Sequence, residues 1–131
     1  MNKIISKLVL IAIAGSMGSL LRFGLSSFIE KHFSHYNQIP TATIIINCFG
    51  CFLFGLIWGL AEYKDWISDE YSIIILVGFL GAFTTFSSYA FDITQHIQKN
   101  QLTLALGLFT IQNFTAILLT LAGILVSKRI V

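Results

Sequence analysis

The sequence predicts an all-α membrane protein with four transmembrane helices, the third of which is broken near its centre. The first observation is composition: 56% of the 131 residues are hydrophobic and 11% are charged, whereas a soluble domain usually carries about 25% charged residues. A short soluble chain has too much surface to hide this many apolar side chains. The other two observations are the lengths of the apolar runs and a polar cluster inside the third run.

Four apolar runs have the length that a bilayer requires. A hydrocarbon core about 30 Å thick needs about 20 apolar residues in a helix. The runs cover residues 4–28, 41–61, 71–97 and 102–126, and short polar segments separate them. This pattern predicts a single transmembrane domain over residues 1–131, without a separate soluble domain.

The first run also has features of a secretory signal peptide. Lys3 and Lys7 make a basic start, and Ala12 and Ala14 have the small-residue spacing of a cleavage site. However, the apolar pattern continues past these alanines to Phe28. We therefore expect the first run to be retained as a transmembrane helix.

The basic residues show a modest asymmetry between the two sides of the membrane. Those on the side of the termini are Lys3, Lys7, Lys64, Lys128 and Arg129, and those in loops on the other side are Lys31 and Lys99. The positive-inside rule favours cytoplasmic termini, but so small a bias leaves insertion in both orientations open. The net charge of +2 is too small to indicate nucleic-acid binding.

Polar side chains within the first two runs have two interpretations each. Arg22 either extends to the interface or places a cation at the mouth of an anion pathway. Asn47 either makes an interhelical hydrogen bond or offers N–H donors to a permeating ion. Thr43 lies one turn before Asn47 on the same face. Further along, Gly55 and Gly59 have the small-xxx-small spacing that favours close helix packing.

The third run contains an unusual polar cluster at residues 78–89. This segment combines two glycines, four hydroxyl side chains and four aromatic side chains, which predicts a helix that breaks within the membrane. Irregular backbone is tolerated at that depth only where protein buries it or a wet cavity lines it. Freed carbonyl groups can bind a cation, and a half-helix N-terminus can bind an anion. Alternatively, the hydroxyl groups bond back to their own helix.

Aromatic and amide side chains continue the polar pattern. Phe86 and Tyr89 share a face, and the electropositive edge of an aromatic ring can meet an anion. In the fourth run Phe109 and Asn113 lie one turn apart. Polar atoms in this run come from Thr110, Gln112, Asn113, Thr115 and Thr120. They either stabilise helix packing or line a pore.

Other signals indicate neither a redox site nor an enzyme. Cys48 and Cys51 have C-x-x-C spacing but lie within an apolar helix, where small packing residues are the simpler interpretation. The sequence has no nucleotide-binding loop, nucleophile elbow or paired intramembrane carboxylates. Asp92, towards the end of the third run, is expected to face the interface or to cap a cation there.

Three of these patterns resemble the motifs of the Fluc (CrcB) family of fluoride channels. They are G-x-x-G-x-x-x-R-F at residues 15–23, T-x-x-x-N-x-x-G at 43–50, and GAFTTFSSY at 81–89. The resemblance implies a passive, fluoride-selective channel that exports fluoride and lowers its cytoplasmic concentration. It also implies location in the plasma (inner) membrane of a prokaryote.

The resemblance implies an assembly and an ion site as well. The family forms an antiparallel, dual-topology homodimer with two pores. It holds a structural Na+ at the dimer centre, bound by backbone carbonyls that map to Gly81 and Thr84. The family's pore and vestibule residues map to Asn47, Phe86, Tyr89 and Arg22. Tyr89 departs from the usual phenylalanine, and Phe109 and Asn113 stand where the family tends to have tyrosine and serine.

The residues themselves agree with fluoride as the ion. Fluoride is small and strongly hydrated, so a pore must replace its water with closely spaced hydrogen-bond donors, and pore size and lining groups decide selectivity. The expected donors are the side chains of Asn47, Thr43, Ser87 and Asn113. A narrow neutral path would disfavour the larger chloride ion.

Two other functions compete with this one. A small multidrug-type cation exporter needs an acid buried in the membrane, but the first acidic residues, Glu30 and Glu62, lie at the ends of the first two runs. A non-transporting membrane assembly subunit would account for the glycines but would leave the cluster at 81–89 without a purpose.

Overall fold

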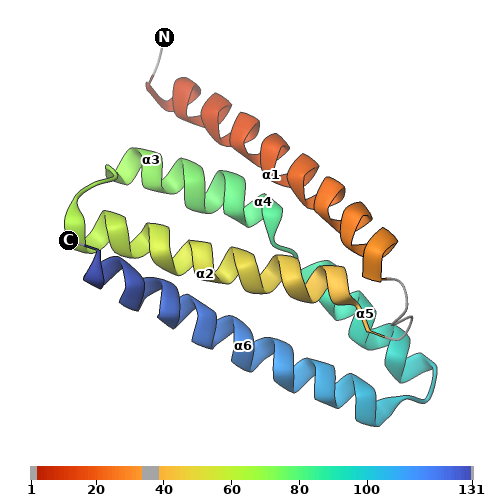
Figure 1. Cartoon of the computed structure of the whole chain (residues 1–131). Coiled ribbons are helices and arrows are strands. Elements are labelled where there is room, and N and C mark those ends of the chain that lie inside the picture. Colours follow the sequence, from red (N-terminus) through yellow and green to blue (C-terminus); the bar gives the residue numbers. More distant parts are fainter. Residues whose placement is uncertain (1–2, 34–38, 131) are drawn as a thin grey trace.

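Four long helical segments make up the structure. The computed structural model describes residues 3–33 and 39–130, and every regular element in these ranges is helical. The segments long and apolar enough to cross a membrane are Lys3–Phe33, Thr41–Lys64, Asp69–Gln98 and Leu102–Arg129 (Figure 1). Each contains one predicted run, so the prediction of four transmembrane helices is confirmed. Most of the polar segment predicted between the first two runs, residues 34–38, lies outside the described residues.

The third segment consists of two half-helices. The first half comprises α3 (Asp69–Ile73), the π-helical turns of η1 (Ile74–Leu80) and α4 (Gly81–Phe83), and the second half is α5 (Phe86–Gln98). Thr84 and Thr85 are extended between them, with φ/ψ of −81°/159° and −148°/115°. Figure 1 shows this short non-helical link between α4 and α5. The helix therefore breaks inside the predicted polar cluster.

Helix α1 (Lys3–Phe33) packs on the first half-helix. A Cβ atom at Gly18 would collide with the carbonyl oxygen of Phe79, and one at Gly78 would lie 3.1 Å from the carbonyl oxygen of Ile11. The backbones of α1 and η1 are thus close together because both present glycine at the crossing.

Helices α2 (Thr41–Lys64) and α6 (Leu102–Arg129) form the largest interhelical contact. A Cβ at Gly55 would collide with the carbonyl oxygen of Thr120, one at Gly59 with Ser127 Oγ, and one at Gly123 with the carbonyl oxygen of Phe52. The prediction that Gly55 and Gly59 mark close helix packing is therefore confirmed.

The buried apolar core borders the helix break. Leu80 and Phe83, in the last turns of the first half-helix, are each 1% exposed and pack in a cluster with Ile46 of α2. Large apolar side chains such as Phe114 and Leu118 are exposed on the outside of the bundle, where an apolar surface suits lipid. The core thus anchors one side of the break, and the polar residues beyond it form the candidate site.

Candidate functional site

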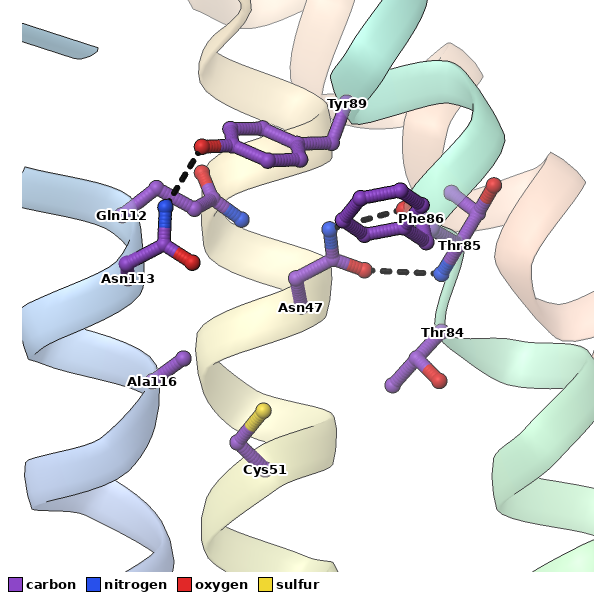
Figure 2. A pocket seen from close by; sticks show the side chains of 9 residues that line it. All are labelled: Asn47, Cys51, Thr84, Thr85, Phe86, Tyr89, Gln112, Asn113 and Ala116. Atoms are coloured by element: carbon purple, nitrogen blue, oxygen red, sulfur yellow. Dashed lines mark hydrogen bonds between the residues drawn. The ribbon is translucent and has the colours of Figure 1, made fainter. Parts of the chain in front are cut away.

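The side chain of Asn47 holds the broken backbone of the third segment. Its Nδ2 donates to the carbonyl oxygen of Thr85 over 3.0 Å, and the backbone N–H of Thr85 donates to Asn47 Oδ1 over 2.8 Å (Figure 2). Asn47 is 8% exposed, so these bonds satisfy backbone groups that lipid cannot. This arrangement is the interhelical hydrogen bond predicted as one interpretation of Asn47. It also leaves the second Nδ2 hydrogen without an acceptor among the described residues.

A glycine on α2 lets the break approach closely. Gly50 lies one turn after Asn47 on the same face. A Cβ atom there would collide with Thr84 Cγ2 and would lie 3.3 Å from the Phe83 ring. The T-x-x-x-N-x-x-G motif therefore supplies both an amide that binds the break and the space that the break occupies.

The break removes the helical donors of two carbonyl groups. In an uninterrupted helix the N–H of Thr85 would bond to Gly81 and the N–H of Ser88 to Thr84. Here the first donates to Asn47 Oδ1 and the second to Thr85 Oγ1, over 3.2 Å. The carbonyls of Gly81 and Thr84 thus lie at the electronegative C-terminal end of a half-helix without their usual donors. Such oxygens suit a small, hard cation.

The opposite side of the break presents a helix N-terminus. Thr85 caps α5 through the bond from Ser88 N–H to its Oγ1, and its hydroxyl lies 3.1 Å from Ser88 Oγ and 3.2 Å from Ser87 Oγ. Because the amide dipoles of a helix give its N-terminus positive character, this end favours an anion. The two half-helices thus direct opposite partial charges towards the break.

A cavity of about 200 Å³ opens beside the break. It lies between α2, the start of α5 and the middle of α6, as Figure 2 shows. Its lining residues are Asn47, Cys51, Thr84, Thr85, Phe86, Tyr89, Gln112, Asn113 and Ala116. None of these described lining residues carries a charge at neutral pH. The cavity brings together five of the predicted site residues: the pore residues Asn47, Phe86, Tyr89 and Asn113, and the predicted cation ligand Thr84.

The aromatic side chains form the wall at the α5 side. Phe86 is 77% exposed, and its ring lies edge-on to that of Tyr89, with centroids 5.7 Å apart and planes at 60°. The Tyr89 ring in turn stacks on Phe109 at 6.5 Å. The Phe86 ring is therefore accessible to an ion or to another chain, whereas Tyr89 is buried among the helices.

The hydroxyl of Tyr89, the departure from the family pattern, joins α5 to α6. It donates to the carbonyl oxygen of Phe109 over 3.3 Å and accepts from Asn113 Nδ2 over 2.7 Å. Asn113 Nδ2 also donates to the Phe109 carbonyl oxygen over 2.6 Å. Both hydrogens of the Asn113 amide are consequently engaged within the chain.

Four other predicted site residues lie outside the cavity lining. Thr43 donates to Asp92 Oδ2 over 2.9 Å, which joins α2 to α5. Ser87 is exposed beside Thr85. Arg22 is on α1, and its Nε is buried without a hydrogen-bond partner among the described residues. Gly81, one of the predicted cation ligands, is also outside the lining.

Four lining residues were not assigned to the predicted site: Cys51, Thr85, Gln112 and Ala116. Cys51 was interpreted as a packing residue. Gln112 was one of the polar residues in the fourth run for which helix packing and pore lining were both left open. Gln112 is 5% exposed, and its Oε1 is buried without a partner in the described part of the chain. The amide of Gln112, which is next to Asn113 in an apolar helix, was the feature of the sequence that could have indicated a role in the cavity.

Most of the chain is similar to proteins of one family. Residues 9–124 match the family described as CrcB-like protein, camphor resistance (CrcB). The chain is 39% identical to the fluoride-specific ion channel FluC of Nitrosococcus oceani, over 95% of this chain and 98% of that protein. It is 33% identical to the protein of the same name from Desulforapulum autotrophicum, with the same coverage of 95% and 98%. The corresponding protein of Maridesulfovibrio salexigens is 40% identical, over 72% of this chain and 74% of its own length.

Proposed function

The chain belongs to the CrcB-like family, and we propose that it is a fluoride-selective ion channel that passively exports fluoride and so lowers its cytoplasmic concentration. The observation that carries this proposal is the uncharged cavity at the helix break, which combines amide groups, an aromatic edge and the N-terminus of α5. Relatives that align over nearly the whole chain are named as fluoride-specific channels. The chain is a multi-pass membrane protein, and we place it in the plasma (inner) membrane of a prokaryote.

The cavity suits a small dehydrated anion for three reasons. The N-terminus of α5 supplies positive partial charge without an ionised side chain. Asn47 retains an N–H donor that is free for the ion. The exposed ring of Phe86 offers its electropositive edge. A neutral lining also avoids trapping the ion, since conduction requires binding weak enough for release.

We propose that the working unit is an antiparallel homodimer with dual topology. Phe86 is 77% exposed and the cavity that it lines is partly open, so a second copy can complete the wall. The small asymmetry of basic residues is compatible with insertion of copies in both directions. Each pore is then built from residues of both copies.

Three predicted pathway residues outside the cavity lining have proposed roles at its approaches. Arg22 attracts fluoride towards the mouth of the cavity through its positive charge. The hydroxyl groups of Thr43 and Ser87 donate hydrogen bonds to the ion outside the cavity. For Thr43, the bond to Asp92 must exchange for one to the ion.

A structural Na+ fits the electronegative side of the break. The carbonyl groups of Gly81 and Thr84 would hold it, because both have lost their helical donors. The ion would stabilise the end of the first half-helix and, in an antiparallel dimer, join the two copies. We expect the melting temperature of the purified protein to rise as the sodium concentration is raised. N-methyl-D-glucamine substitutes for sodium in the reference buffer, so that the ionic strength stays constant. Equal melting temperatures in the two salts would exclude the site.

Fluoride efflux from proteoliposomes tests the proposed function directly. Vesicles are loaded with potassium fluoride or potassium chloride, and valinomycin carries the compensating potassium. We expect rapid fluoride efflux and little chloride efflux. Equal efflux of the two ions, or none of either, contradicts the proposal. A cation exporter is not favoured, because the described cavity has no acidic side chain to exchange protons for cations.

A further inference from the structure

The cavity has fewer free hydrogen-bond donors than its polar lining suggests. Both Nδ2 hydrogens of Asn113 and the hydroxyl hydrogen of Tyr89 are donated within the chain. The Thr84 hydroxyl donates to the carbonyl oxygen of Leu80 over 2.9 Å. Asn47 gives one hydrogen to Thr85 and keeps one. A fluoride ion that sheds its water needs several donors, and these groups supply too few.

Gln112 is the exception among the lining residues. Its Oε1 is buried without a hydrogen-bond partner among the described residues, no hydrogen bond joins it to the other residues drawn in Figure 2, and only 5% of its surface is exposed. A primary amide has two N–H donors and an acceptor oxygen. Burying such a group without partners costs free energy, so native proteins normally satisfy it. The buried Oε1 needs a donor such as water, and the absence of a protein partner in the described part of the chain leaves the Nε2 hydrogens for another ligand in the cavity.

The position of the Gln112 side chain agrees with this role. In Figure 2 its amide lies between the Asn113–Tyr89 pair and Asn47. An ion in the cavity would thus have the free hydrogen of Asn47 on one side and those of Gln112 on the other. The volume of about 200 Å³ also leaves room for water beside the ion.

We propose that Gln112 is a further fluoride-coordinating residue, which donates from Nε2 to the ion while a co-permeating water donates to its Oε1. This role rests on the proposed function as a fluoride channel. It makes Gln112, and not the neighbouring Asn113, the main contribution of α6 to dehydrating the ion. A small ion gains most from donors that are already in place and have no competing acceptor.

Two substitutions at this position separate coordination from packing. Gln112→Met keeps the length of the side chain and removes the donors, whereas Gln112→Glu keeps the shape, removes the donors and adds a negative charge. We expect Gln112→Met to lower fluoride efflux about tenfold or more, because hydrogen bonds to a charged partner are lost. Gln112→Glu should lower it further through repulsion of the anion. The matched control is Gln98→Met at the exposed end of α5, which should conduct like the wild type.

The outcomes distinguish this proposal from the function on which it rests. A wild-type protein without fluoride efflux overturns both. Wild-type efflux with unchanged efflux in Gln112→Met overturns the role of Gln112 alone. Gln112→Met could instead lower the melting temperature while the fluoride concentration at half-maximal flux stays constant. That result indicates a purely structural role and also overturns the proposal. If Gln112→Met is not monodisperse in detergent, Gln112→Glu decides, and wild-type efflux by that variant refutes the role.

Discussion

Helices α2 and α6 meet in two different ways along their length. Towards the C-terminal ends of both helices, Gly55, Gly59 and Gly123 allow backbone and side-chain atoms of the opposite helix to pack against the glycine Cα atoms. Further along, Asn47 of α2 and Gln112 of α6 line a cavity beside the start of α5 (Figure 2). The same pair of helices thus has a half in close backbone contact (the packed half), beside which an apolar pocket of about 190 Å³ lies, and a half that lines the polar cavity (the open half). The packed half fixes the spacing that the open half needs to position its amides.

The two halves should respond differently to substitution. In the packed half a larger side chain should destabilise the fold, and fluoride transport should fail only as a consequence. In the open half a change of polarity should affect transport while the protein remains folded. Parallel measurements of thermal stability and of fluoride efflux therefore test the comparison.

Gly55→Leu should have the largest effect, because it places a side chain where the carbonyl oxygen of Thr120 lies. Overpacking of this kind typically costs about 1–3 kcal/mol, and a backbone contact has little freedom to move aside. We expect most of the protein to aggregate when it is extracted in detergent, as measured by fluorescence-detected size-exclusion chromatography. Gly107→Ala is the control, since a Cβ atom there has no neighbour within 4 Å. A monodisperse Gly55→Leu protein with wild-type stability would show that α2 and α6 can move apart at this position without loss of stability.

Asn47→Asp should have the largest effect on transport in the open half. The carboxylate cannot donate to the Thr85 carbonyl oxygen as Asn47 Nδ2 does, and it adds a negative charge to the cavity. We expect fluoride efflux to fall at least about 100-fold, since both a free donor and the support of the break are lost. Efflux is measured from proteoliposomes with a fluoride electrode. Efflux within threefold of the wild type would exclude Asn47 from the pathway.

Phe86→Ile should reduce transport without destabilising the subunit. The ring is 77% exposed and lies in contact with Tyr89, so its loss removes an aromatic edge and little buried area. We expect efflux to fall about tenfold, because aliphatic groups have no electropositive edge. The melting temperature should stay close to that of the wild type. A large fall in melting temperature with unchanged efflux would instead assign Phe86 to packing.

Tyr89→Phe should have the smallest effect. It removes the hydroxyl bonds to Asn113 and to the Phe109 carbonyl oxygen and leaves the ring in place. We expect stability to fall by about 1 kcal/mol, the usual contribution of such hydrogen bonds, with efflux within a few-fold of the wild type. Thermal unfolding and efflux assays on the same preparation measure both quantities. A loss of efflux comparable to that of Phe86→Ile would show that the hydroxyl itself contacts the ion.

The sequence predicted the framework of the molecule well. Hydropathy located all four membrane-spanning segments, and the structure extends the predicted runs by a few residues at their ends. The cluster of glycine and hydroxyl residues predicted the break, which lies at Thr84 and Thr85. Asn47, Phe86, Tyr89 and Asn113 were predicted pathway residues, and all four line the cavity.

The acceptor that each polar side chain donates to could not be predicted from the sequence. Thr43 and Asn113 were expected to offer donors to an ion, but in the structure their donors are used by Asp92 and by Tyr89 and Phe109. The partners of Thr43 and Asn47 lie 49 and 38 residues away along the chain. Spacing along one helix identifies the face of a residue but not the atom opposite it.

Hydropathy and local composition are therefore enough to predict where the helices lie, where one of them breaks, and that uncharged polar groups gather at the break. Those properties follow from local composition and from the cost of exposing backbone to lipid. Which donors are already engaged and which remain free can be read only from the packed fold. That depends on how α2, α5 and α6 pack, and it is this packing that engages the Asn113 amide and leaves the Gln112 amide available.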